Sequence, residues 1–286
     1  MYKRQAFTLT PGARVEVIRG VSEDHLTNGV TSNVDHAFLP GVGAYYAVTE
    51  RLGALAGVYR GFSPAPPGDS RSGPELSVNG ELGVRYDDRP ARAEVIGFYN
   101  DYSNLTDICT LSSGCDEQDL DRQFSAGEAR IYGLEMFGAH EIPVGLGVRG
   151  VFGGAYTLTY AEFQSTFDSQ DPIYGSVTTG DEMPYVPRHQ LTVTAGAEHD
   201  RFGVNAAAFY VARMREEAGS GPIEDGLATD DQFWMDVSAY YRPLEWTKLY
   251  VDARNVTDSV NVVSHRPYGA RPNAPRWIQV GVKVEL

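Results

Sequence analysis

The chain has 286 residues and a formal net charge of −14, from 24 basic and 38 acidic side chains. That balance excludes a nucleic-acid-binding protein, which needs a basic surface. The 31 glycines, 17 tyrosines and 12 phenylalanines suit turns and strands, and no segment approaches the roughly 20 apolar residues of a membrane-spanning helix.

Twelve segments are predicted to be β-strands because apolar and polar residues alternate along them. In segment 76–87, for example, Leu82 and Val84 share one parity and Glu81 and Arg85 share the other. The predicted strands in chain order are 13–19, 42–49, 53–61, 76–87, 91–102, 128–140, 145–160, 188–199, 202–214, 231–242, 247–255 and 276–286.

The predicted connections alternate without exception between short and long. The short turns are 50–52, 88–90, 141–144, 200–201 and 243–246. The long connections are 20–41, 62–75, 103–127, 161–187, 215–230 and 256–275. Outer-membrane barrels have short periplasmic turns and long extracellular loops. The sequence therefore predicts an all-β fold, a portion of an antiparallel transmembrane β-barrel with about 12 strands.

Two other architectures also have alternating strands. A soluble β-sandwich binding module has shorter strands and no strict order of loops. A self-contained barrel, acting as a passive pore or an outer-membrane enzyme, is permitted because even strand numbers from about 8 upward occur. Pairing of the first strand with the last would indicate a closed barrel, whereas two unpaired edges would indicate a fragment.

Aromatic residues lie near the ends of several predicted strands. Barrels have girdles of such rings at both membrane interfaces, although each ring taken singly also fits a packed core. The residues are Tyr86, Tyr156, Tyr160, Tyr241, Trp246 and Trp277.

Acidic residues form two runs in predicted loops. We expect them to be solvated loop charges, and the alternative is that divalent cations bridge them to lipopolysaccharide. The runs are Asp116, Glu117, Asp119 and Asp121, followed by Glu216, Glu217, Glu224, Asp225, Asp230 and Asp231.

Cys109 and Cys115 lie in one polar predicted loop, separated by five residues. Outside the inner membrane the compartment is oxidising, so we expect a structural disulfide. No metal site is predicted, because the two thiols have no neighbouring histidine and the six histidines show no ligand spacing. Since no catalytic motif is present, no catalytic residue, cofactor or enzymatic activity is expected.

Seven blocks, in order along the chain, resemble the C-terminal half of the barrel of TonB-dependent outer-membrane receptors, in particular the ferric dicitrate branch. Tyr132-Gly-Leu-Glu135 resembles a strand motif that is widespread in these receptors. The similarity covers most of residues 40–286. The other blocks are Gly57–Gly68, Glu81–Tyr86, Glu94–Leu105, Gly180–Leu191, Arg254–Asp258 and Arg266–Arg276.

The resemblance implies a barrel of about 22 strands filled by an N-terminal plug domain. The chain is therefore expected to be a fragment, residues 1–286 being the C-terminal part of the barrel without the plug domain, with residues 1–40 poorly placed. The first residues, Met1 to Gln5, have no apolar region and are not expected to be a signal peptide. The chain ends in Val-Glu-Leu, where the family usually ends in an aromatic residue. The strand 276–286 is expected to be an exposed edge.

The resemblance also implies a location and partners. The location is the outer membrane of a Gram-negative bacterium. The partners are the TonB–ExbB–ExbD system, reached through the missing N-terminal part, the barrel-assembly machinery, and lipopolysaccharide or other outer-membrane lipid.

The implied activity is TonB-energised import of a ferric chelate, iron dicitrate or another siderophore. Such a chelate is anionic, and arginine forks at the outer mouth would bind it. Each candidate arginine also suits a simpler role, in which it balances a neighbouring acid. The candidate ligand-binding residues are Arg60, Arg71, Arg213, Arg215, Arg266 and Arg271.

Overall fold

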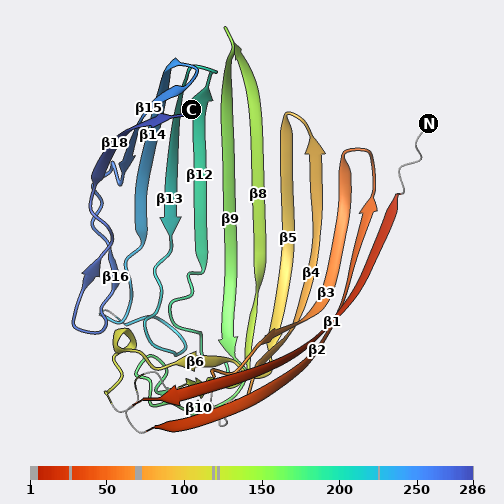
Figure 1. Cartoon of the computed structure of the whole chain (residues 1–286), viewed down its shortest axis with the longest axis vertical. Coiled ribbons are helices and arrows are strands. Elements are labelled where there is room, and N and C mark those ends of the chain that lie inside the picture. The colour runs from red at the N-terminus through yellow and green to blue at the C-terminus, as the bar shows by residue number, and fades with distance from the viewer. Residues whose placement is uncertain are drawn as a thin grey trace.

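Twelve antiparallel strands form one curved sheet in the computed structural model, which describes residues 6–25, 28–67, 73–117, 120, 123–224 and 226–285 (Figure 1). Neighbours in the sheet follow the chain order. The strands are β1 (Phe7–Asp24), β2 (Gly29–Ala47), β3 (Leu52–Ser63), β4 (Glu75–Asp88), β5 (Ala91–Tyr102), β8 (Ala129–Gly145), β9 (Val148–Phe163), β12 (His189–Glu198), β13 (Phe202–Val211), β14 (Gln232–Leu244), β15 (Thr247–Arg254) and β18 (Trp277–Val284).

The connections divide the sheet into two ends. The turn end carries the short turns that follow β2, β4, β8, β12 and β14, and the loop end carries the tip of the β1–β2 hairpin and the long connections 64–74, 103–128, 164–188, 212–231 and 255–276. Three small two-stranded sheets and one 3-10 turn lie within these loops. They are β6 (Thr106–Ile108) with β7 (Gln123–Ser125), β10 (Phe167–Asp168) with β11 (Ser176–Val177), β16 (Val262–Ser264) with β17 (Arg271–Pro272), and η1 (Leu111–Ser113). Within the described residues, no helix is long and apolar enough to cross a membrane.

The two faces of the sheet differ in chemistry because side chains alternate along each strand. The apolar face includes the row Tyr241, Leu249 and Val282, which register places side by side. It is widely exposed, with 77% of Val280 accessible. The polar face carries charged and amide side chains, for example Asp236, whose carboxylate pairs with Arg254.

The sheet is open, with β1 and β18 as its two edges (Figure 1). No pairing between these strands occurs among the described residues. The predicted all-β class, with about twelve antiparallel strands, is confirmed. A two-sheet sandwich does not form, because all twelve long strands belong to one sheet.

The first hairpin differs from the prediction. The segment 20–41 was predicted to be a long connection, which is wrong, and the predicted strand 13–19 is confirmed as a strand but is only the middle part of β1. β1 and β2 pair continuously from Phe7–Tyr46 to Asp24–Gly29, and the far part of this hairpin curves across the loop end (Figure 1). Alternation is lost there because Asp35 and His36 are adjacent polar residues. Asp35 is nevertheless buried, where its carboxylate accepts the amide of Ala65 at 3.1 Å.

The turn between β8 and β9 also differs from the prediction. It was predicted at 141–144, but β8 continues to Gly145. The chain reverses at Gly145, Leu146 and Gly147, whose φ angles of 112°, 53° and 76° lie in the region that favours glycine. The other predicted strands overlap the observed ones.

A small hydrophobic core lies among the loops rather than between layers. Phe163, Val177 and Tyr174 are buried there together with Ala126 and Ala129. The rings of Phe163 and Tyr174 meet edge to face at a centroid distance of 5.8 Å. The loops that contribute to this core are therefore packed against one another at the loop end.

Candidate functional site

Four of the long loops meet at one arginine. Arg266, in loop 255–276, pairs with Glu217 of loop 212–231. Its guanidinium also donates to the backbone carbonyls of Ser113 and Pro172, each at 3.3 Å. Those carbonyls belong to loops 103–128 and 164–188, so one side chain connects all four loops.

A buried carboxylate next to Arg266 strengthens this junction. Glu216 is only 1% exposed. Its Oε1 accepts the backbone amide of His265 at 2.8 Å, and its Oε2 lies 3.0 Å from His265 Nδ1. The Tyr185 hydroxyl lies 3.0 Å from Ser264 Oγ, which joins loop 164–188 to the same place.

A second charged cluster lies beside this junction. Arg215 is largely buried, and its Nε donates to Glu182 Oε2 at 3.1 Å while Nη2 donates to the carbonyl of Gly221 at 2.9 Å. Arg188 pairs with the other oxygen of Glu182, and its guanidinium lies 4.0 Å from the centre of the Tyr160 ring. Glu182 is thus shared by two arginines.

These side chains line a small cavity of about 160 Å³, to which Arg213 also contributes. We call Arg188, Arg213, Arg215 and Glu182 the arginine pocket. Three arginines and one acid line the pocket, so its lining has surplus positive charge. Guanidinium forks match planar carboxylates and other oxyanions, which makes the pocket suited to an anionic ligand.

The other candidate arginines lie elsewhere. Arg60 is paired in register with Val78 and shares the parity of Val58, which places it on the apolar face. Arg266 occupies the loop junction, and exposed Arg271 donates to the carbonyl of Arg266 at 3.5 Å. Arg71 lies outside the described residues.

Sequence reasoning missed Arg188 and Glu182. Arg188 directly precedes β12 at the loop end, which is the same kind of position that singled out Arg213 after β13. Selecting arginines next to strand ends at the loop end would therefore also have selected Arg188. Glu182 has no such signal, because it is brought to the pocket by a fold of loop 164–188 onto Gly219.

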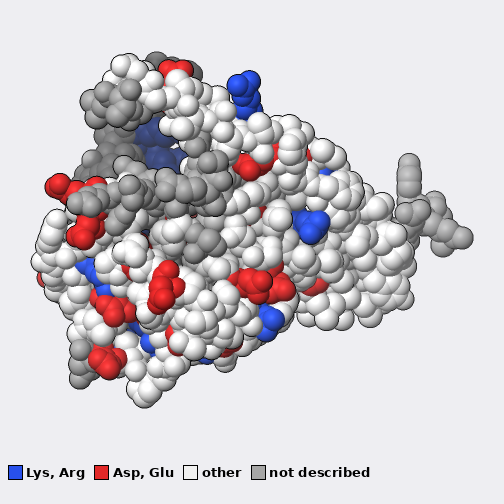
Figure 2. Space-filling view, turned by 90° about the horizontal axis from the view of Figure 1, so that it is seen from below, with Lys and Arg blue, Asp and Glu red and all other residues white. Residues whose placement is uncertain are grey.

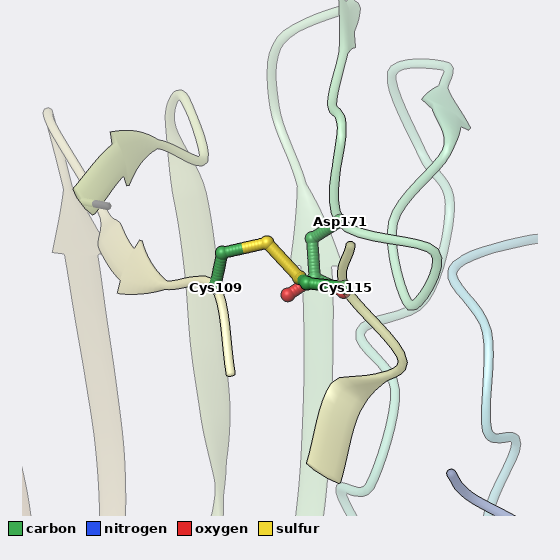
Figure 3. A group of neighbouring side chains, drawn as sticks. All are labelled: Cys109, Cys115 and Asp171. Carbon is green, nitrogen blue, oxygen red and sulfur yellow. A yellow bond between two sulfur atoms is a disulfide. The ribbon is translucent and has the colours of Figure 1, made fainter. Parts of the chain in front are cut away.

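Cys109 and Cys115 form a disulfide in loop 103–128, with Asp171 of the neighbouring loop beside it (Figure 3). The potential ligand atoms of these three residues lie within 4.8 Å of one another. Because each sulfur is bonded to the other, neither is available as a thiolate ligand. The Asp171 carboxylate instead accepts the backbone amide of Ile173 at 2.9 Å, so the group is structural.

The acidic residues of the loops are only partly solvated. Figure 2 views the loop end, where acidic and basic side chains lie interspersed. Asp230 and Asp231 accept backbone amides from Val262 and Arg213, and Glu216 is buried. The expectation of solvated charge is therefore wrong for Glu216, whereas Asp230 and Asp231 are exposed to solvent as expected. Asp119, Asp121 and Asp225 lie outside the described residues.

Tyr174 is a titratable group that holds two loops together. Its hydroxyl donates to the Asp107 carboxylate in loop 103–128. Burial raises the pKa of Tyr174 above its usual range, and the hydrogen bond to Asp107 raises it further. The folded protein therefore keeps this proton at pH values where the unfolded chain has lost it.

We expect the contact between these loops to weaken above about pH 10, the ordinary tyrosine pKa. Its stability contribution is complete below that pH and falls as the pH rises, because only the unfolded state then releases the proton. Limited subtilisin digestion of loop 164–188 between pH 8 and 11 measures this. Tyr174→Phe should flatten the profile and exposed Tyr268→Phe should not. Equal profiles for both variants would refute the assignment.

The family model described as TonB dependent receptor-like, beta-barrel, matches residues 2–256. No curated protein matches the chain.

Solved structures match over nearly the whole chain. The ferric citrate transporter FecA in its unliganded form has a TM-score of 0.71 and 19% identity, covering 98% of this chain and 43% of that one. The ferric-catecholate import receptor Fiu from E. coli K12 has a TM-score of 0.70 and 18% identity, covering 98% of this chain and 42% of that one. The siderophore receptor PiuA from Acinetobacter baumannii has a TM-score of 0.72 and 16% identity, covering 98% of this chain and 41% of that one. The chain spans less than half the length of these structures.

Proposed function

The chain belongs to the TonB-dependent receptor β-barrel family, and we propose that it forms the C-terminal part of an outer-membrane receptor for active import of a ferric chelate. Members of this family are transport receptors rather than enzymes, and they reside in the outer membrane of Gram-negative bacteria. The apolar face then contacts lipid, the turn end faces the periplasm and the loop end faces the exterior.

Two observations support the assignment to part of a larger barrel. The sheet is open between β1 and β18, and the chain covers 41–43% of the FecA, Fiu and PiuA structures. In this proposal the plug domain and the remaining strands are supplied by another part of the receptor. The alternative of a self-contained pore or outer-membrane enzyme has no comparable support, because it requires β1 and β18 to pair.

The proposed class of ligand rests on the arginine pocket. The pocket contains three arginines, Arg188, Arg213 and Arg215, and a single acid, Glu182, so its net charge is positive. It lies at the exterior loop end. The ligand is then an anionic ferric chelate, iron dicitrate or another siderophore. Arg266 and Arg271 act by holding the loops around the pocket, while Arg60 contacts lipid or its headgroups.

The proposal includes the partners of such a receptor. TonB, with ExbB and ExbD, supplies energy through the N-terminal part of the receptor. The barrel-assembly machinery inserts the strands, and lipopolysaccharide surrounds the apolar face at the loop end.

Binding and uptake of ⁵⁵Fe-labelled chelates by iron-starved cells that carry the complete gene test this proposal. Cells with and without TonB should both bind ferric dicitrate or a ferric siderophore at the surface, and only cells with TonB should accumulate iron inside. Absence of surface binding for every chelate would overturn it. Uptake that is equal in both strains would favour a passive pore.

A further inference from the structure

A second cavity lies on the polar face, where β14, β15 and β18 meet loop 255–276. It has a volume of about 390 Å³ and is separate from the arginine pocket. Trp234 and Trp277 both line it, together with Gln232, Asp236 and Arg254. We call these five residues the tryptophan subsite.

Two indole rings form the aromatic part of the cavity wall. Trp234 lies parallel to Phe209, with ring centroids 5.0 Å apart and an angle of 14° between the planes. That stacking fixes the orientation of the Trp234 ring. Trp277 begins β18, opposite Arg254 in the register, and 42% of it remains accessible. It shares the parity of Gln279, so it faces the barrel interior instead of joining the aromatic girdle.

The polar groups of the cavity are fixed in place. Asp236 Oδ2 accepts Arg254 Nη1 at 2.7 Å, and its Oδ1 accepts the Asn255 amide at 2.9 Å. Arg254 is thereby held over the cavity with further donors remaining. Asn255 and Asn273 form the wall, because their side-chain amides bind backbone carbonyls of the same loop.

Gln232 adds an uncharged polar group to the cavity. Its side chain lines the cavity although the residue is only 8% exposed. Its side-chain amide is not one of the buried polar atoms that lack a partner in the described part of the chain, so it is an accessible donor and acceptor in the cavity wall. A ligand with oxygen or nitrogen atoms can form hydrogen bonds with this amide.

We propose that the tryptophan subsite binds a planar aromatic ring that carries oxygen donors, as an arm of the transported chelate. Indoles stack with flat rings, and a guanidinium interacts favourably with ring oxygens and ring faces. An aliphatic hydroxycarboxylate such as citrate has no flat ring for the indoles to stack on. The inference rests on the proposed function and deepens it, since it specifies phenolate or catecholate arms for the chelate.

The chain itself contains the probe for a direct test. Its third tryptophan, Trp246, lies in the turn between β14 and β15 at the opposite end of the sheet. Trp246→Phe therefore leaves only the two subsite indoles. The matched control is Trp234→Phe with Trp277→Phe, which leaves only Trp246. Gallium(III) tris(2,3-dihydroxybenzoate) replaces the ferric complex as ligand, because gallium(III) is redox-inert.

We expect the gallium complex to quench the fluorescence of the two-indole variant with saturation. The variant that retains only Trp246 should show a linear loss caused by absorption of light by the complex. Gallium citrate should quench neither variant. Equal quenching curves in both variants, or saturation with gallium citrate alone, would overturn the inference.

Cell binding separates failure of this inference from failure of the proposed function. In the complete receptor, Trp234→Ala with Trp277→Ala should weaken binding of ferric tris(2,3-dihydroxybenzoate) by about tenfold, because two stacking contacts are lost. Trp246→Phe should leave that binding unchanged. If the parent receptor binds ferric dicitrate but not the aromatic chelate, the inference fails and the function stands. If it binds no ferric chelate, both fail.

Discussion

Replacing Arg215 with methionine is expected to destabilise the loop end and to weaken chelate binding together. Arg215 is buried, and removing it leaves the Glu182 carboxylate with one partner fewer and the Gly221 carbonyl without its guanidinium. Breaking such a pair costs about 3–5 kcal/mol. We expect the low end, about 3 kcal/mol, because Arg188 still neutralises Glu182. Hydrogen exchange at the paired amides of Glu182 and Gly219 would measure the loss locally.

Arg213 supplies the matched control because it lines the same pocket but is exposed. Arg213→Met should leave the local stability near that of the parent protein, within about 0.5 kcal/mol, as for most surface substitutions. Its chelate affinity should still fall about tenfold, since a charge-assisted contact is typically worth about 1.5–3 kcal/mol. Unchanged affinity in both variants would exclude the arginine pocket as the binding site.

Replacing Val193 with arginine is expected to impair membrane insertion strongly. Val193 lies midway along β12, on the apolar face, between Gly154 and Ala208 of the neighbouring strands. It is 47% exposed, so the new charge would face lipid. Arginine on the lipid face near the bilayer midplane costs about 2–4 kcal/mol. The free energy of unfolding from lipid vesicles, obtained by urea titration, measures this cost.

The preceding residue tests whether the cost comes from the face or only from the added charge. Thr192→Arg places the same side chain on the polar face, opposite Ala155 and Phe209. There the guanidinium remains hydrated in the interior, so the change in unfolding free energy should stay below about 1 kcal/mol. Equal losses for the two variants would contradict the assignment of the faces.

The strands could be predicted from the sequence wherever one face is apolar and the ends carry turn residues. β4 illustrates this, because Leu82 and Val84 share its apolar face and the predicted segment 76–87 closely matches Glu75–Asp88. The β1–β2 hairpin could not be predicted in the same way. Beyond Gly20 its polar residues occupy both faces, and strand pairing follows from backbone hydrogen bonds that leave no periodic signal.

The candidate site was less predictable because it is built between loops. Arg213 and Arg215 were both predicted as candidate ligand-binding residues, and both line one pocket. The partner that holds Arg215, however, is Glu182, 33 residues away. Arg266 reaches the Ser113 carbonyl across 153 residues of sequence. Such contacts depend on how the loops pack, and local spacing carries no information about them.

The junction at Arg266 has a consequence for how these loops vary and move. Surface loops ordinarily accept substitutions and insertions one at a time. Here Arg266 bonds to one group in each of the other three loops, so displacing one loop disturbs the side chain that holds the rest. The four segments therefore form one cooperative unit. We expect the four loops to open in one all-or-none step. Their sequences should also diverge together among relatives. Grafting a single loop from a relative should then fail, whereas grafting all four should succeed.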